Sequence, residues 1–209
     1  MSDAEANRRP IAARDSGWAR GFASALARSA ITPNQISAAS VLFAGIGSAL
    51  LVCWHTLAGL LLCAVCIQLR LVCNLIDGMV AMEGGKASAL GKVYNEFPDR
   101  VADSLLIVAL GYACGWVWLG WLGALLAALT AYVRVFGGSL GFAQDFRGPL
   151  AKQQRMAVLT AACVIAAAET LWHGERYALL AAAVIIALGS ALTCVTRTRA
   201  IAAQLRAGA

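Results

Sequence analysis

Charged residues are scarce in this sequence. They make up 13% of its 209 residues, whereas hydrophobic residues make up 60%, and the mean hydropathy is +0.72. A soluble domain carries about twice that charged fraction. The composition therefore argues against a soluble protein and predicts an integral membrane protein.

Histidine is also nearly absent, because His55 and His173 are the only two. We expect both to cap helices at the outer surface, and no Ser-His-Asp or Cys-His arrangement is present. The seven cysteines lie within or at the ends of apolar segments. Cys63 and Cys66 have zinc-like spacing, but they lie in a hydrophobic span without a second pair or a nearby histidine. We predict packing cysteines, with no disulfide and no structural metal.

Signals for several other protein classes are missing. The sequence contains no internal repeat, no low-complexity linker and no basic-aromatic nucleic-acid motif. Its polar, arginine-containing start does not lead into a short apolar run with a small-residue cleavage site, so we expect no secretory signal peptide.

Long hydrophobic runs are abundant. A bilayer crossing needs about 20 mostly apolar residues, and six segments come close to this requirement. We predict an all-α membrane protein with about six transmembrane helices. The candidate spans are Ile36–Trp54, Leu57–Val80, Val101–Trp118, Leu119–Phe142, Met156–Trp172 and Tyr177–Val195.

An amphipathic segment precedes the first span. Trp18, Phe22 and Leu26 recur at i, i+4 and i+8, and arginines occupy other positions of the segment. This pattern favours a helix that lies in the membrane interface. We therefore expect a cytoplasmic tail and interfacial helix over residues 1–30, followed by one membrane domain over residues 31–209.

Basic residues are distributed asymmetrically between the predicted loops. Because cytoplasmic loops carry an excess of lysine and arginine, we expect a multi-pass protein of the inner (cytoplasmic) membrane with both termini in the cytoplasm. The net charge of +6 then indicates attraction to an anionic inner leaflet. The basic residues on the predicted cytoplasmic side are Arg8, Arg9, Arg14, Arg20, Arg28, Lys86, Lys92, Arg147, Lys152, Arg155, Arg197, Arg199 and Arg206.

Carboxylates and amides interrupt the apolar pattern between the second and third spans. Asn74 and Asp77 lie one helical turn apart, while Asn95, Asp99 and Asp103 recur every four residues. Two helix ends would then present oxygen ligands to each other at the cytoplasmic side. Such ligands suit a hard cation, Mg²⁺ or Mn²⁺, which completes its shell with water and substrate phosphates. This segment predicts phosphoryl chemistry.

The spacing of the same segment resembles the signature of the CDP-alcohol phosphatidyltransferases, D-x2-D-G-x2-A-R-x8-G-x3-D-x3-D. The chain length, the six predicted spans and the Thr-Pro-Asn sequence before the first span extend the resemblance over most of the chain. The positions that correspond without a gap are Asn74, Asp77, Gly78, Ala81, Met82, Gly91, Asn95 and Asp99.

The resemblance implies a membrane enzyme that transfers a phosphatidyl or related group from a CDP-lipid to a hydroxyl acceptor and releases CMP. In that family, two divalent ions on four aspartates bridge the pyrophosphate, and the last aspartate is the general base. Carried over, Asp77 is a metal ligand, and Asp99 is a ligand and the base. Gly78 and Ala81 allow close approach of the nucleotide, and Gly91 allows close approach of the two helices. The family also implies a homodimer.

Three positions depart from the signature. Asn74 and Asn95 replace two aspartates, and Met82 replaces the arginine. An amide oxygen ligates a hard cation without contributing charge, so we expect weaker metal binding or only one tightly held ion. The departures also support an alternative function, a catalytically degenerate member that binds CDP-lipid or assists another lipid enzyme.

A second alignment inserts one helical turn in the loop and takes Asp99 and Asp103 as the final aspartate pair. It restores both carboxylates, but it places Asn95 where glycine belongs and leaves Gly91 unexplained. Within the gapless alignment, Glu96 and Asp103 are nearby acids that compensate for lost charge. The identity of the base, Asp99 or Asp103, stays open at this point.

Basic residues within or next to the spans are candidates for phosphate binding. Arg70 lies one turn before Asn74, and a charge inside a membrane segment usually lines functional, water-filled space. It is either an internal partner for Asp77 or Glu96 or a phosphate ligand. Three more residues are candidates to bind acceptor or lipid phosphate, and for Lys152 and Arg155 the alternative is the positive-inside pattern. The three residues are Arg134, Lys152 and Arg155.

Overall fold

The computed structural model describes residues 16–86, 89–172 and 177–207, and this part of the chain is entirely helical outside its turns and loops. The all-α prediction is confirmed. The helices are α2 (Gly17–Ala27), α3 (Pro33–Cys53), α4 (Leu57–Glu83), α5 (Gly91–Ala113), α6 (Val117–Ser139), α7 (Lys152–Trp172) and α8 (Tyr177–Ala207).

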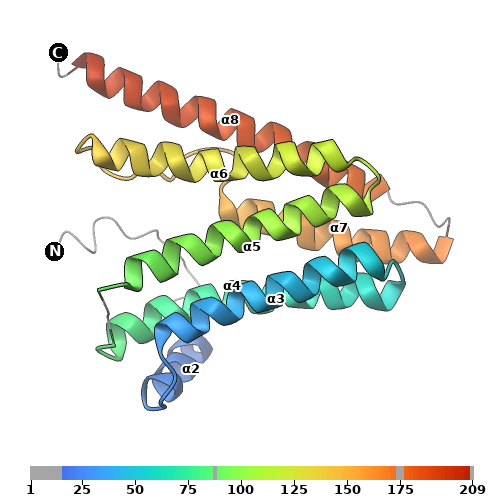
Figure 1. The fold of residues 1–209 in the computed structure, drawn as a ribbon, viewed down its shortest axis with the longest axis horizontal. Helices are drawn as coiled ribbons and strands as arrows, with labels where there is room; N and C mark the ends of the chain where they lie inside the picture. Colours follow the sequence, from blue (N-terminus) through green and yellow to red (C-terminus); the bar gives the residue numbers. More distant parts are fainter. Residues whose placement is uncertain (1–15, 87–88, 173–176, 208–209) are drawn as a thin grey trace.

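Five of these helices are long and apolar enough to cross a membrane, namely α3, α4, α6, α7 and α8. The remaining predicted span, the third in chain order, corresponds to α5, which lies alongside the others in Figure 1. Its 23 residues would extend about 34 Å, but its first half carries Asp99, Arg100 and Asp103. By helix length and hydropathy this is a multi-pass membrane protein.

The predicted third span, Val101–Trp118, has the wrong bounds. The helix α5 begins ten residues earlier, at Gly91, and ends at Ala113, so the predicted span runs across a turn into α6. Gly115 in that turn has a φ of 79°, a left-handed conformation that glycine adopts at little cost. Hydropathy misses this turn because apolar residues continue through it.

Local capping explains where α3 and α4 begin. The Thr32 hydroxyl accepts a hydrogen bond from the Gln35 amide, the Gln35 side chain accepts one from the Thr32 amide, and Pro33 occupies the first turn. Together these form a capping box. At α4, the Thr56 hydroxyl accepts from the Gly59 amide. The chain therefore reverses within three residues between the two helices.

Small residues allow the close approach of α5 and α6. A Cβ placed on Gly111 would lie 2.6 Å from the Gly120 Cα atom. Without a hydrophobic force between helices in lipid, such backbone contact is a main source of association. The α5–α6 hairpin is thereby held tightly, and α5 also packs against α3.

The interfacial segment forms α2, which packs on α4 through the buried residues Ala19 and Ala23. Trp18 and Phe22, predicted as the apolar face, are 56% and 52% exposed. The alanines contact the protein, and the aromatic residues point away from it. Aromatic side chains suit the level of the lipid headgroups, so the orientation agrees with a helix at the membrane interface.

Candidate active site

The structure brings three acidic residues of α4 and α5 into the interior of the bundle. Asp77, Asp99 and Asp103 are 4%, 7% and 2% exposed. Asp77 is also close enough to Asp99 and Lys152 to interact with them electrostatically. Buried charges inside a membrane domain are costly and typically mark a functional site. We call this group of residues the acidic cluster.

Asp77 has one engaged and one unengaged oxygen. The Ser37 hydroxyl of α3 donates to Asp77 Oδ2 at 2.5 Å. Asp77 Oδ1 is buried and has no hydrogen-bond partner among the described residues, and the same holds for the amide nitrogen of Asn74, one turn earlier on α4. An unpaired buried carboxylate oxygen is costly, so this part of the cluster has capacity for a ligand.

Both carboxylate oxygens of Asp103, in contrast, accept hydrogen bonds from arginines. Arg70 donates from Nη2 to Asp103 Oδ1 at 2.6 Å, and Arg155 donates from Nη2 to Asp103 Oδ2 at 3.0 Å. Arg155 also donates to the Thr130 hydroxyl and to the Leu150 carbonyl. Both guanidinium groups are almost fully buried. This network ties α4, α5 and α7 together.

Asp99 lies between a lysine and the same arginine. The Lys152 ammonium, at the start of α7, donates to Asp99 Oδ2. Arg70 Nη2 lies 3.4 Å from Asp99 Oδ1, and Arg100 Nη2 lies 3.8 Å from Asp99 Oδ2. The Lys152 side chain is 17% exposed. The side chains of Asp99 and Lys152 are thus less deeply buried than those of Asp103 and Arg155.

A second polar group lies beside the cluster. Arg134 of α6 donates to Glu96 of α5 at 2.6 Å and also to the side chain of Gln144. Its guanidinium carbon lies 5.5 Å from the centre of the Phe146 ring. Arg134 therefore connects the start of α5 to the loop between α6 and α7.

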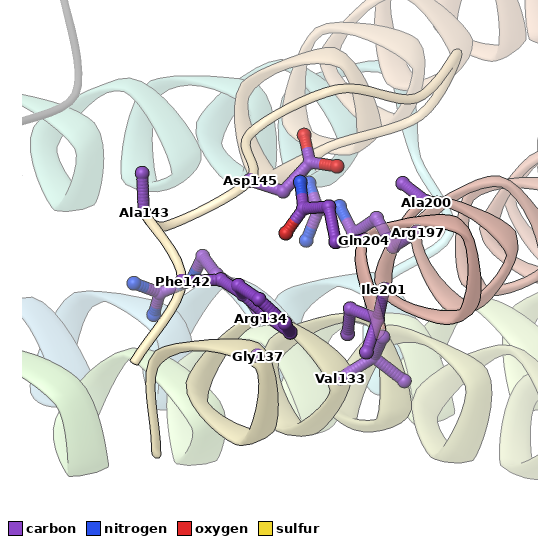
Figure 2. Close-up of a pocket in the computed structure, with 10 residues that line it drawn as sticks. All are labelled: Val133, Arg134, Gly137, Phe142, Ala143, Asp145, Arg197, Ala200, Ile201 and Gln204. Atoms are coloured by element: carbon purple, nitrogen blue, oxygen red, sulfur yellow. The ribbon is translucent and has the colours of Figure 1, made fainter. Parts of the chain in front are cut away.

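Arg134 also lines a small pocket between α6, this loop and α8 (Figure 2). Arg197 of α8 donates to the carbonyls of Thr130 and Arg147. Burial acts to raise the pKa of Asp145, but hydrogen bonds from the Arg147 side chain and amide outweigh it, so the pKa of Asp145 lies below its ordinary value. The pocket is lined by both signs of charge.

The remaining signature positions are less buried than the three aspartates. Gly78, Ala81 and Gly91 are partly buried, and Asn95 is exposed on the face of α5 that also carries Asp99, one turn away. Met82, at the position of the family's arginine, is 54% exposed. Their roles in nucleotide and metal binding stay predictions.

Sequence reasoning assigned no role to Ser37. It lies 40 residues from Asp77 along the chain, and its only sequence signal was its place at the end of ITPNQIS, three residues after Asn34. It is 3% exposed. Ser37 is a direct partner of the carboxylate that matches the signature.

The donor set fits one divalent ion better than two. Among the described residues, no three His, Cys, Asp or Glu side chains are grouped to hold a metal. The Asp77 oxygen and the Asn74 amide are hard oxygen donors one turn apart that suit Mg²⁺ or Mn²⁺. Lysine and arginine occupy the carboxylate oxygens of Asp99 and Asp103. The α4 side of the cluster can accept an ion, whereas the α5 side is already neutralised.

Neither a protein-family model nor a curated protein matches the sequence. Crystal structures of Mycobacterium tuberculosis phosphatidylinositol phosphate synthase (PgsA1) do match the fold. The CDP-DAG-bound structure has a TM-score of 0.71 and 18% identity, covering 89% of this chain and 94% of that chain. The structure with manganese and citrate has a TM-score of 0.69 and 18% identity, covering 88% of each chain.

The apo form of the same enzyme matches with a TM-score of 0.67 at 18% identity, covering 86% of this chain and 93% of that chain. This chain has the membrane fold of that CDP-alcohol phosphatidyltransferase. The predicted fold class is therefore confirmed over most of the chain. At this identity the similarity establishes the fold, and activity must be argued from the site.

Proposed function

We propose that this protein is a CDP-alcohol phosphatidyltransferase of phospholipid synthesis. It would move a phosphatidyl or related phosphoalcohol group from a CDP-lipid, with CDP-diacylglycerol as the first candidate, to a hydroxyl acceptor. The observation that carries the proposal is the acidic cluster, in which Asp77 and Asp99 hold signature positions and are buried within membrane helices. The likeness to an enzyme crystallised with CDP-DAG supports the same class of donor.

In this reaction the acceptor hydroxyl oxygen forms a bond to the lipid-bearing phosphorus. The bond from that phosphorus to the CMP oxygen breaks, and CMP leaves with the bonding electrons. The hydroxyl proton passes to a carboxylate, which acts as general base. Asp99 is the better candidate for this base because its side chain is more exposed than that of Asp103, and because arginines hold both oxygens of Asp103.

A divalent ion would be held by Asp77 Oδ1 and the side-chain oxygen of Asn74, with Asn95 as a further predicted ligand. Asp99, which the signature also gives as a ligand, is bonded to Lys152 instead. When bound, Mg²⁺ or Mn²⁺ would neutralise the pyrophosphate and stabilise the departing CMP. Ser37 orients Asp77 through its hydrogen bond to Oδ2. The other carboxylate oxygen of Asp77, Oδ1, would then be available to the divalent ion.

The basic residues would divide into two groups. Arg70 and Arg155 are buried against Asp103, so we assign them mainly to positioning the carboxylates, with phosphate binding as their other predicted role. Lys152 and Arg134 are more accessible and would contact the phosphates of the lipid or of the acceptor.

The nucleotide would approach the backbone where α4 ends and α5 begins. Gly78, Ala81 and Gly91 lie there and bear at most a methyl group, so they leave room for it. The lipid tails would remain in the bilayer while the head group reached the cluster from the cytoplasmic leaflet.

A second candidate function is a catalytically degenerate protein that binds CDP-lipid without turning it over. Asn74, Asn95 and Met82 favour it because each removes a charged group of the family signature. The ion pairs of Asp99 with Lys152 and of Asp103 with Arg155 also favour the degenerate function, because less negative charge remains to bind metal ions.

CMP release separates the two functions. Purified protein would be incubated with CDP-diacylglycerol, Mg²⁺ or Mn²⁺, and a panel of glycerol 3-phosphate, serine, inositol phosphate and lipid alcohols. We expect CMP to appear with one acceptor and to be absent in the Asp77→Asn variant. Binding of CDP-diacylglycerol without CMP release for every acceptor would instead establish the degenerate function.

A further inference from the structure

The two sides of the acidic cluster are neutralised by different means. On α5, the Lys152 ammonium is bonded directly to Asp99. On α4, Asp77 keeps a buried oxygen without a partner among the described residues, and Asn74 adjoins it. A lysine therefore neutralises the carboxylate on α5, whereas the unpaired oxygen of the carboxylate on α4 has no cation bonded to it among the described residues.

Charge balance makes this difference consequential. A site with four aspartates and two divalent ions is neutral before substrate binds. Here two of the four signature positions are amides, so Asp77, Asp99 and Asp103 contribute three negative charges, and Lys152, Arg70 and Arg155 contribute three positive ones. One divalent ion brings the site to two positive charges, which suits a pyrophosphate. Two ions would leave four positive charges in a desolvated site, where like-charge repulsion is strong.

Lys152 is also placed to act on substrate. Its side chain is partly exposed, in contrast to Arg70 and Arg155, which are almost completely buried. It begins α7, and the chain around it is anchored by the Leu150 amide, which donates to the Thr193 hydroxyl of α8. An ammonium fixed in this way replaces part of the charge of a metal ion without replacing its ligand geometry.

We propose that Lys152 takes the place of a second divalent ion, so that the site binds one such ion, on the α4 side. The ammonium holds Asp99 and faces the phosphates of the bound substrate. The inference rests on the proposed function only for the identity of that substrate, a CDP-linked pyrophosphate.

Metal stoichiometry tests the proposal directly. Mn²⁺ binding to the purified full-length protein in detergent would be measured by electron paramagnetic resonance and by calorimetry, without substrate. We expect one Mn²⁺ per chain in the wild type and in Lys152→Arg, and two in Lys152→Met, because removal of the ammonium frees Asp99. The control Lys86→Met removes the same charge from a lysine that, within the described part of the chain, donates to the Ser29 and Ile31 carbonyls, and it should bind one ion.

A second measurement covers the case in which Lys152→Met does not fold. Mn²⁺ affinity in folded Asp77→Asn should fall about tenfold or more, because a direct ligand is lost, whereas Asp99→Asn should remain close to wild type. Any wild-type stoichiometry other than one, or equal losses in the two aspartate variants, would overturn the proposal.

The inference and the proposed function fail separately. If one Mn²⁺ binds but no acceptor yields CMP, the transferase function is wrong and the one-ion site stands. If CMP is released but two ions bind the wild type, the function stands and the role of Lys152 is wrong.

Discussion

At the scale of single residues, the three buried aspartates differ in what holds them. Asp77 has a hydroxyl partner and an oxygen without a partner among the described residues, and Asp103 has two arginines at 2.6 and 3.0 Å. Asp99 has a lysine and, at the longer distances of 3.4 and 3.8 Å, Arg70 and Arg100. A carboxylate that two guanidinium groups hold is a poor proton acceptor and a poor metal ligand, because it is already neutralised. This difference separates a chemical role for Asp77 and Asp99 from a structural role for Asp103.

Asp77→Asn and Asp99→Asn should each lower CMP release by about 10²-fold or more while the protein stays folded, since each removes a group that acts on the transition state. Initial rates with CDP-diacylglycerol and the best acceptor would be compared after size-exclusion chromatography of each variant. Rates near wild type in both variants would exclude these residues from catalysis.

Asp103→Asn should act mainly on stability. Its replacement leaves Arg70 and Arg155 buried without their counter-charge, and breaking such a network costs about 3–5 kcal/mol. In detergent, the unfolding temperature of Asp103→Asn should lie far below that of the wild type, and the decrease should be much larger than for Asp99→Asn. A folded, equally stable but inactive Asp103→Asn would instead identify Asp103 as the base and favour the alignment with one inserted turn.

Asn74→Asp should tighten Mn²⁺ binding, because a second carboxylate beside Asp77 strengthens attraction to a dication. The exposed Asn95 is farther from the buried oxygen, so Asn95→Asp alone should have the smaller effect and the double variant the larger one. Calorimetric titration of all three variants would check this order. Unchanged affinity in the double variant would contradict both positions as ligands. Activity need not rise, since the neighbouring groups are arranged around amides.

The spacing along α4 and α5 predicted that Asp77 and Asp99 would lie close together, because it places residues on common helix faces. The predicted internal partner of Arg70, Asp77 or Glu96, was wrong, because Arg70 pairs with Asp99 and Asp103. The sequence was insufficient to pair Asp103 with Arg155 or Asp77 with Ser37. Those contacts join residues 52 and 40 positions apart and depend on how the helices pack. Periodicity within one helix carries no information about that packing.

At the scale of helices, α5 both packs in the helix bundle and carries residues of the acidic cluster. Its first half carries the charged residues, and its second half packs tightly on α6 at Gly111 and Gly120. Hydropathy located only the apolar half, which is why the predicted span started at Val101 rather than Gly91. The charged turns remain helical because α4, α6 and α7 supply the counter-charges.

Gly111→Ala should destabilise the α5–α6 hairpin. The added Cβ would lie 2.6 Å from the Gly120 Cα atom, so the helices must separate, at a cost of about 1–3 kcal/mol for overpacking. Gly45→Ala in α3 is the matched control, because its Cβ meets no atom within 4 Å. The unfolding temperature should fall for Gly111→Ala and stay at the wild-type value for Gly45→Ala. Equal unfolding temperatures of the two variants would contradict a tight contact between Gly111 and Gly120.

At the scale of the whole molecule, one end of the helix bundle gathers the proposed chemistry. The end of α4, the start of α5 and the ends of α6 and α8 lie together there, and the α3–α4 and α5–α6 turns lie at the other end (Figure 1). Among the described residues, the basic ones that predicted the topology belong to the first end, whereas the α3–α4 and α5–α6 turns are almost uncharged. A homodimer remains a prediction from the family resemblance.

The first end should therefore face the cytoplasm, by the positive-inside rule. In a cysteine-free background, Lys86→Cys between α4 and α5 should react with an impermeant thiol reagent only after the cytoplasmic side is opened. Trp172→Cys, at the end of α7 and 80% exposed, is the opposite control and should react in intact cells. A CDP-lipid carries its nucleotide at the cytoplasmic surface in this topology, so the acidic cluster must open there to receive it. Labelling of Lys86→Cys from outside would show that the orientation is the opposite one. The cluster would then lie on the side of the membrane without nucleotide, and this result would contradict the transferase function.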